Sequence, residues 1–271
     1  TQACPLDHER LLDCNHDDYF HTSPSLDSYL ATHWNTASSS FLTNAGADST
    51  GPDVTAPDVT APILRFTGTT GKTLVPVTVS WSAKHDTNGI VSTELAQSVD
   101  GGEYTNLTLS EATSTRVRRW LSPGHSYGYR AAATDGVGNT ASAEAVGLVP
   151  SVRQESARTI GYSGTWTRVA APYVMGGYTR YAKVRRASAS TSFSGRGVAW
   201  VSRRGPGSGK AYVYVDGQYA ATVNLYSSVG RARRIVFARS WPTPGAHRLF
   251  VSVAGTSGHP RVDLDAFLFI R

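Results

Sequence analysis

Residues 198–217 read VAWVSRRGPGSGKAYVYVDG, and this stretch decides the fold expected for the C-terminal half of the chain. Residues 198–202 begin as a strand with side chains on alternate faces, and residues 211–216 alternate again between small and larger side chains. Alternation with a period of two predicts β-strands. The segment between them, residues 203–210, holds three cations and three glycines and is too long for a tight hairpin. We therefore expect two strands that carry a cationic loop.

The pair Asp216-Gly217 is expected to form the next turn, because Asp-Gly accepts the positive φ angles of a short hairpin. Another strand is expected over residues 219–225. No helical periodicity competes with this interpretation in residues 151–271, which are predicted to be all β.

Three later segments carry a family resemblance together with the opening stretch. They are VNLY (223–226), PGAHRLFVSVAGTSG (244–258) and VDLDAFLFI (262–270). Residues 160–271 resemble the non-catalytic β-sandwich modules at the C-termini of secreted bacterial hydrolases, which are galactose-binding-like, jelly-roll carbohydrate-binding domains. The resemblance implies a jelly-roll fold and a carbohydrate ligand.

Sugar binding uses aromatic faces for C–H surfaces and polar groups for hydroxyls. The aromatic candidates are Trp200, Tyr212, Tyr214, Tyr226 and Trp241, and the polar candidates are Arg203, Arg204, Lys210 and Asp263. The loop glycines Gly205, Gly207 and Gly209 are expected to bring backbone N–H groups to the ligand.

Charge is unevenly distributed along the chain. Residues 1–61 hold one Arg against nine acids, residues 62–150 hold seven cations and seven acids, and residues 151–271 hold 18 cations against four acids. Strand parity places Arg231, Arg233 and Arg239 on one face. Such an excess favours an anionic polymer as partner as strongly as it favours a merely solvated surface. Specific nucleic-acid binding is the weaker alternative, because no base-reading motif is present.

Catalytic motifs are absent from the sequence. There is no HExxH, no G-x-S-x-G, no P-loop and no zinc-type Cys/His cluster. Asp263 and Asp265 alternate on one strand as a glycosidase pair would, but structural or ligand-bonding roles are the more common reading. We therefore expect no enzyme and no cofactor in this chain. No apolar run approaches the ~18 residues of a membrane span.

The N-terminal residues 1–42 carry the two cysteines. Cys4 and Cys14 are predicted to form a local disulfide, with two free thiols as the alternative. Calcium on Asp13, Asp17 and Asp18 stays an alternative to turns and caps, since oxygen-rich loops suit it. No His spacing predicts a metal centre.

A second resemblance rests on CPLDHERLLDCNHDDYFHTSP followed by SYLATHWNTASSSFL. Residues 1–42 resemble the end of the catalytic domain in secreted bacterial metalloproteases of the metzincin kind, whose zinc motif and Met-turn are missing here. The resemblance implies a short, partly helical remnant at this end. The chain also begins without Met, and we expect a piece of a longer or processed polypeptide.

Two further segments complete the organisation. Residues 43–61 contain PDVTA twice in tandem, which predicts an extended linker without fixed structure. Residues 62–150 read as short strands and turns that resemble a fibronectin type III or bacterial Ig-like domain, with Trp81 in its core and Tyr127 at the tyrosine corner. Residues 151–271 would be the jelly-roll domain.

The sequence therefore predicts an all-β chain of two sandwich domains behind a remnant and a linker. Its predicted function is that of a secreted, monomeric accessory region of a hydrolase, in which the basic, aromatic-rich C-terminal domain binds a polysaccharide or a cell-surface polymer. The upstream catalytic domain of the same polypeptide would be its other partner. The alternative is a purely structural or adhesive tail without a ligand.

Overall fold

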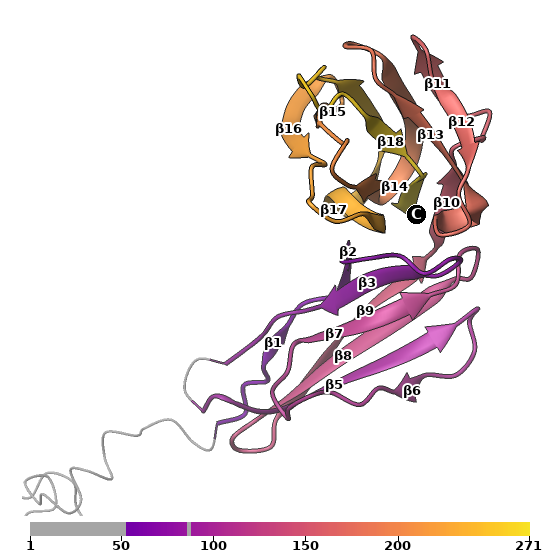
Figure 1. Cartoon of the computed structure of the whole chain (residues 1–271). Coiled ribbons are helices and arrows are strands. Elements are labelled where there is room, and N and C mark those ends of the chain that lie inside the picture. The colour runs from indigo at the N-terminus through magenta and orange to yellow at the C-terminus, as the bar shows by residue number, and fades with distance from the viewer. Residues whose placement is uncertain (1–52, 86–87) are drawn as a thin grey trace, which may run out of the picture. The chain divides into compact units, whose positions relative to one another are not determined.

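A computed structural model describes residues 53–85 and 88–271 (Figure 1). The regular secondary structure of these residues is almost entirely β, and the single helical element among them is the 3₁₀ turn η2 (Met175–Gly177). No helix in this part of the chain has the length and apolar character needed to cross a membrane. The predictions on Cys4, Cys14, the three aspartates and the remnant at residues 1–42 lie outside the described residues.

The N-terminal sheets enclose a core between two antiparallel layers. One sheet has the order β2 (Ile63–Phe66), β3 (Val75–Ser80), β7 (Arg116–Leu121). The other has the order β6 (Thr105–Asn106), β5 (Ile90–Val99), β8 (Tyr127–Asp135), β9 (Thr140–Leu148). Val75, Val77 and Val79 are fully buried because period-two alternation directs them all to one face of β3. The fibronectin type III identity of this segment stays a prediction.

The end of the predicted linker is part of the sheet structure. β1 (Asp58–Val59) pairs antiparallel with β4 (Ala83–Lys84), and the N–H of Thr60 donates to the carbonyl of Ser82 at 2.9 Å. Val59 packs against the core, which gives the second PDVTA unit an apolar anchor that composition alone did not reveal. The expectation that all of residues 43–61 lack fixed structure was therefore wrong for this part. The other domain bounds stay predictions.

The two aromatic assignments in the N-terminal sheets are confirmed. Trp81 lies in the core, and the Tyr127 hydroxyl accepts a hydrogen bond from the N–H of Ser122 at 2.9 Å. This bond fixes the chain between β7 and β8 because it satisfies a backbone donor at the corner.

Replacing Tyr127 by Phe should lower the free energy of unfolding by about 1 kcal/mol, since the Ser122 N–H loses its acceptor. Chemical denaturation followed by fluorescence measures the change. Tyr173→Phe is the matched control, because Tyr173 is 54% exposed, and it should change stability by under ~0.5 kcal/mol. Equal effects of the two substitutions would contradict the corner role.

The C-terminal sheets are a seven-stranded sheet and a three-stranded one. The larger has the order β10 (Pro150–Gln154), β19 (Ala266–Ile270), β14 (Ser188–Arg204), β17 (Arg231–Val253), β15 (Lys210–Val215), β16 (Gln218–Asn224), and β11 (Ile160–Ser163) also pairs with β14. The smaller has the order β12 (Thr167–Ala170), β13 (Tyr178–Ala182), β18 (Val262–Leu264).

Residues 198–217 form the predicted strands, but the order of these strands in the sheet differs from the expected one. β14 and β15 are both strands, but they are not neighbours, because β17 lies between them. Asp216 and Gly217 form the predicted turn, with φ angles of 53° and 80°, and β16 follows.

β14 is buried on both faces over residues 198–201. Val198 and Trp200 pack with Val213 and Val215 of β15, whereas Ala199 and Val201 pack in a second cluster that also holds residues of β2 and β19. A strand covered on both sides is a continuous apolar run, as VAWV is. The alternate faces expected for residues 198–202 are therefore both covered, each by a different core.

Candidate functional site

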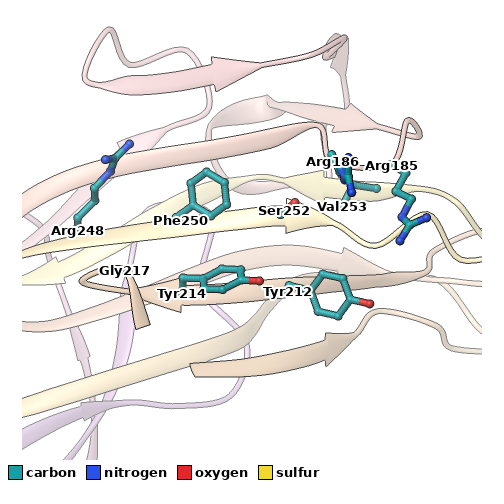
Figure 2. Close-up of a pocket in the computed structure, with 9 residues that line it drawn as sticks. All are labelled: Arg185, Arg186, Tyr212, Tyr214, Gly217, Arg248, Phe250, Ser252 and Val253. Atoms are coloured by element: carbon teal, nitrogen blue, oxygen red, sulfur yellow. The ribbon is translucent and has the colours of Figure 1, made fainter. Parts of the chain in front are cut away.

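A groove of about 530 Å³ lies on the open face of β15 and β17 (Figure 2). The register pairs Tyr212 with Ser252 and Tyr214 with Phe250, so each pair stands on the same side of the sheet. Their neighbours along the strands, such as Val213 and the other valines of β15, point into the core. The alternation of β15 and β17 thus produces an aromatic face above a packed layer.

The aromatic rings of Tyr212, Tyr214 and Phe250 form the floor of this groove. Tyr214 meets Phe250 edge to face, with centroids 5.8 Å apart and an interplanar angle of 69°, and meets Tyr219 of β16 in the same way at 5.9 Å and 76°. Such contacts hold rings in place. Tyr212 is 40% exposed. Among the described residues neither Tyr212 nor Tyr214 has a hydrogen-bond partner for its hydroxyl, which leaves both phenols available to a ligand.

Serine hydroxyls border the floor on the β14 side. Ser188 pairs with Ser252 and Ser190 pairs with Phe250 in the β14–β17 register. The Ser190 hydroxyl accepts a hydrogen bond from the Arg248 guanidinium at 3.3 Å. The face therefore combines rings with short polar groups that can exchange hydrogen bonds.

Guanidinium groups stand at both ends of the groove. Arg248 lies at one end, and Arg185 and Arg186 lie at the other (Figure 2). The last two belong to a turn closed by a hydrogen bond from the Ala187 N–H to the Val184 carbonyl, 3.1 Å. The Arg186 N–H donates to the Val253 carbonyl at 2.9 Å, which ties the turn to the end of β17.

The backbone of the predicted cationic loop is hydrogen-bonded to the segments beside it. The Gly205 N–H donates to the Leu225 carbonyl at 3.1 Å, and the Gly209 N–H donates to the Arg261 carbonyl at 2.9 Å. The Arg204 guanidinium donates to the carbonyl of Tyr226 at 3.3 Å. The expectation that Gly205 and Gly209 present N–H groups to a ligand was therefore wrong, because both donors are satisfied within the protein.

Gly209→Ala should destabilise the C-terminal sheets by about 1–3 kcal/mol, the usual cost of overpacking. A Cβ at this position would lie 1.9 Å from the His259 carbonyl oxygen and 2.9 Å from Thr256 Oγ1. Gly207→Ala is the matched control, because a Cβ there meets nothing within 4 Å. The thermal unfolding midpoints of the two variants measure the difference in stability. An unchanged midpoint for Gly209→Ala would show that the loop is not packed in this way.

The other predicted ligand residues divide into buried and exposed. Trp200 and Asp263 are fully buried, and the indole N–H of Trp200 donates to the Asp263 carbonyl at 3.2 Å. Neither side chain can reach a polymer in solvent, so both are corrected to core residues. The structure leaves Arg203 half-buried and Lys210 exposed. Lys210 shares the groove face of β15 by parity with Tyr212.

Tyr226 and Trp241 lie in aromatic clusters outside the groove lining. Tyr226 is 45% exposed and meets His259 edge to face at 5.0 Å. Trp241 stacks on His247 with centroids 3.8 Å apart and an angle of 17°. Of the predicted ligand residues, the structure thus brings Tyr212 and Tyr214 together in one groove.

The groove also contains residues that sequence reasoning missed. They are Phe250, Ser252, Arg248, Arg185 and Arg186. A signal was present for three of them: in RLFVSV, residues 248–253, Arg248, Phe250 and Ser252 alternate with apolar residues. That pattern predicts a half-buried strand with a polar and aromatic outer face. No comparable pattern marks the turn at Arg185 and Arg186.

Three of the four acids in residues 151–271 are buried in the interior. Asp263 accepts two hydrogen bonds from Arg261, at 2.8 and 2.6 Å, and the buried Glu155 pairs with Arg168 at 2.7 Å. Asp265 is fully buried and accepts a hydrogen bond from the Met175 N–H at 3.1 Å. Burial raises the pKa of Asp265 to about 7, against the opposing effect of that bond.

Stability should therefore fall as pH rises. The folded state holds the Asp265 proton more tightly than the unfolded chain does, so this stabilisation is complete below about pH 4 and is lost by about pH 7. The loss is at most about 4 kcal/mol. In Asp265→Asn the amide oxygen still accepts the Met175 N–H, and the decline between pH 4 and pH 7 should shrink. Unfolding curves of both proteins at several pH values test this, and parallel pH profiles would refute it.

Comparisons with known proteins do not identify a family or a function for this chain. No protein-family model and no curated protein matches the chain. Solved structures that resemble it include a family two carbohydrate esterase from Cellvibrio japonicus, at 14% identity over 45% of this chain and 34% of the esterase, with a TM-score of 0.36. The match thus spans about a third of that protein.

Two smaller structures also resemble the chain. One is a carbohydrate-binding module, CBM36, in complex with calcium and xylotriose, at 13% identity, 45% of this chain, 99% of that chain and a TM-score of 0.32. The other is the CBM36-1 domain of a multidomain xylanase from the hindgut metagenome of Trinervitermes trinervoides, at 13% identity, 45% and 96% coverage and a TM-score of 0.32. At these scores the likeness carries no functional conclusion, and function has to be argued from the residues of this chain.

Proposed function

We propose that the C-terminal sheets bind a polysaccharide in the groove formed by β15 and β17. The observation that carries this proposal is the floor of three rings, Tyr212, Tyr214 and Phe250, in an open groove. Ordinary protein surfaces bury such rings or scatter them singly. Here strand register holds them next to one another.

The chemistry of the groove suits a sugar chain. Ring faces pack against the C–H surfaces of pyranoses, and the phenol and serine hydroxyls can bond sugar hydroxyls as donors or acceptors. Tyr214 and Phe250 are positioned by an edge-to-face contact, which lowers the entropy lost on binding.

The wider context is part of the same proposal. The protein would be an exported, non-catalytic accessory region that holds a hydrolase, in the first instance a metalloprotease, near a polysaccharide surface. Support for the protease context is the resemblance of residues 1–42, and support for binding is the groove. The competing function is a structural β-sandwich without a ligand, which the closed loop at residues 205–209 favours.

The test removes rings from the floor. The double variant Tyr212→Ala/Tyr214→Ala should lose retention on immobilised or insoluble polysaccharides by about tenfold or more, because stacking of two rings is lost. Affinity electrophoresis and pull-down across a polysaccharide panel measure retention. Both rings stand on the outer face of β15, so thermal unfolding should show a folded protein.

Trp120→Ala is the control, because Trp120 is 53% exposed on β7. It removes a large exposed ring outside the groove and should leave retention unchanged. If the unaltered protein is retained on no polysaccharide at low salt, the proposed function fails and the structural module is favoured.

A further inference from the structure

We infer that the groove selects an anionic polysaccharide, one whose chain carries carboxylate or sulfate groups. This inference rests on the proposed function and names the class of its ligand. It is carried by the three guanidinium groups at the ends of the groove, by their lack of acidic partners and by the backbone conformation that places one of them.

Charge in the groove is uncompensated. Among the residues that the structure describes, no ion pair joins Arg185, Arg186 or Arg248 to a carboxylate, and no acid lines the groove. Asp216, which precedes the lining residue Gly217, bonds His247 at 2.8 Å and the backbone N–H of Arg248 at 2.7 Å. The Arg248 guanidinium instead donates to Ser190, which leaves most of its donors free.

The remaining acids of the C-terminal sheets are occupied inside the protein. Glu155 is paired with Arg168 and Asp263 with Arg261, and Asp265 is buried against the Met175 N–H. An aromatic floor bounded by three unpaired cations therefore presents one sign of charge only. A groove of this kind attracts an anionic chain and binds a neutral one through the rings alone.

Arg186 is held in a conformation that arginine rarely adopts. Its φ is 69°, at the third position of the turn Val184–Ala187, where glycine is the residue that avoids strain. A Cβ at the neighbouring Gly255 would lie 2.7 Å from the Arg185 Cβ, so the turn is pressed closely onto the end of β17. The fold thus places an arginine where stability alone favours glycine, which points to a role for the side chain.

Spacing favours a chain over a single sugar. Arg248 and Ser252 are four residues apart on β17, which corresponds to ~13 Å at the usual rise per residue. Arg185 and Arg186 lie beyond Ser252 at that end (Figure 2). The two cationic ends are therefore too far apart for one sugar ring, and a repeated anionic group on an extended polymer can reach both.

The experiment compares matched charged and neutral polymers on the full chain. Polygalacturonate and its carboxyl-reduced form differ only in the carboxylate, and dextran sulfate and dextran differ only in the sulfate. We expect the charged member of at least one pair to bind about tenfold more tightly or better. The preference should shrink as ionic strength rises from low salt to about 0.15 M. The pair that shows the larger difference identifies the anionic group.

Arg186→Gly is the decisive variant. It removes one guanidinium and also relieves the positive φ, so it should bind the charged polymer several-fold less well while its thermal midpoint stays equal or rises. Arg248→Gln, which keeps a donor for Ser190, should weaken binding in the same direction. Arg118→Ala is the matched control, because Arg118 is an exposed cation on β7, outside the groove.

The outcomes separate the two proposals. Equal binding of charged and neutral polymers, lost only in Tyr212→Ala/Tyr214→Ala, would overturn the anionic preference and keep the polysaccharide function. Equal losses in Arg118→Ala and Arg186→Gly would show diffuse charge and would also overturn it. Tighter binding of a single-stranded oligonucleotide than of every polysaccharide would overturn both, since rings and cations also bind nucleic acid. Retention on none of the polymers would remove the proposed function itself.

Discussion

The pairing of β14 with β17 is the interaction on which the rest of the C-terminal structure depends. The two strands are 17 and 23 residues long, and their register shifts at three places. The C-terminal end of β17 pairs with β15 and carries the groove, while β14 residues 197–201, which pair with the other half of β17, carry β19 and include the doubly buried segment 198–201. At the junction, a Cβ on Gly195 would lie 2.3 Å from the Ile270 carbonyl oxygen. Only glycine allows β14 to approach the end of β19 this closely.

Arginine has two different environments in these sheets. Arg168 stacks over Tyr178 at 3.7 Å and Arg261 over Tyr181 at 4.0 Å, and each also pairs with a buried carboxylate. Planar, weakly hydrated guanidinium groups suit such layers, where an ammonium would lose more hydration. The large positive charge of residues 151–271 is therefore partly structural. Among the described residues, the arginines of the groove differ from these two in that none of them forms an ion pair with a carboxylate.

The sequence predicted the kind of structure better than the site. Alternation and the Asp216-Gly217 turn were sufficient for strands, because both signals are local. Strand order was not, since nothing local shows that β17 enters between β14 and β15. Trp200 and Asp263 could not be recognised as core residues, because alternation does not tell a solvent face from a second core. The rule that alternate strand residues share a face also failed for Arg233. Its φ is 55°, and it lies in an irregular part of the β14–β17 ladder.

The place of β19 in the sheet has a consequence for biosynthesis. β19 lies between β10 and β14, and its pairing with β10 joins residues more than a hundred positions apart in sequence. The larger sheet cannot close until residues 266–270 have been synthesised, so the strands made before them wait with unpaired edges and exposed apolar faces. We expect such a chain to be prone to aggregation while its synthesis is incomplete.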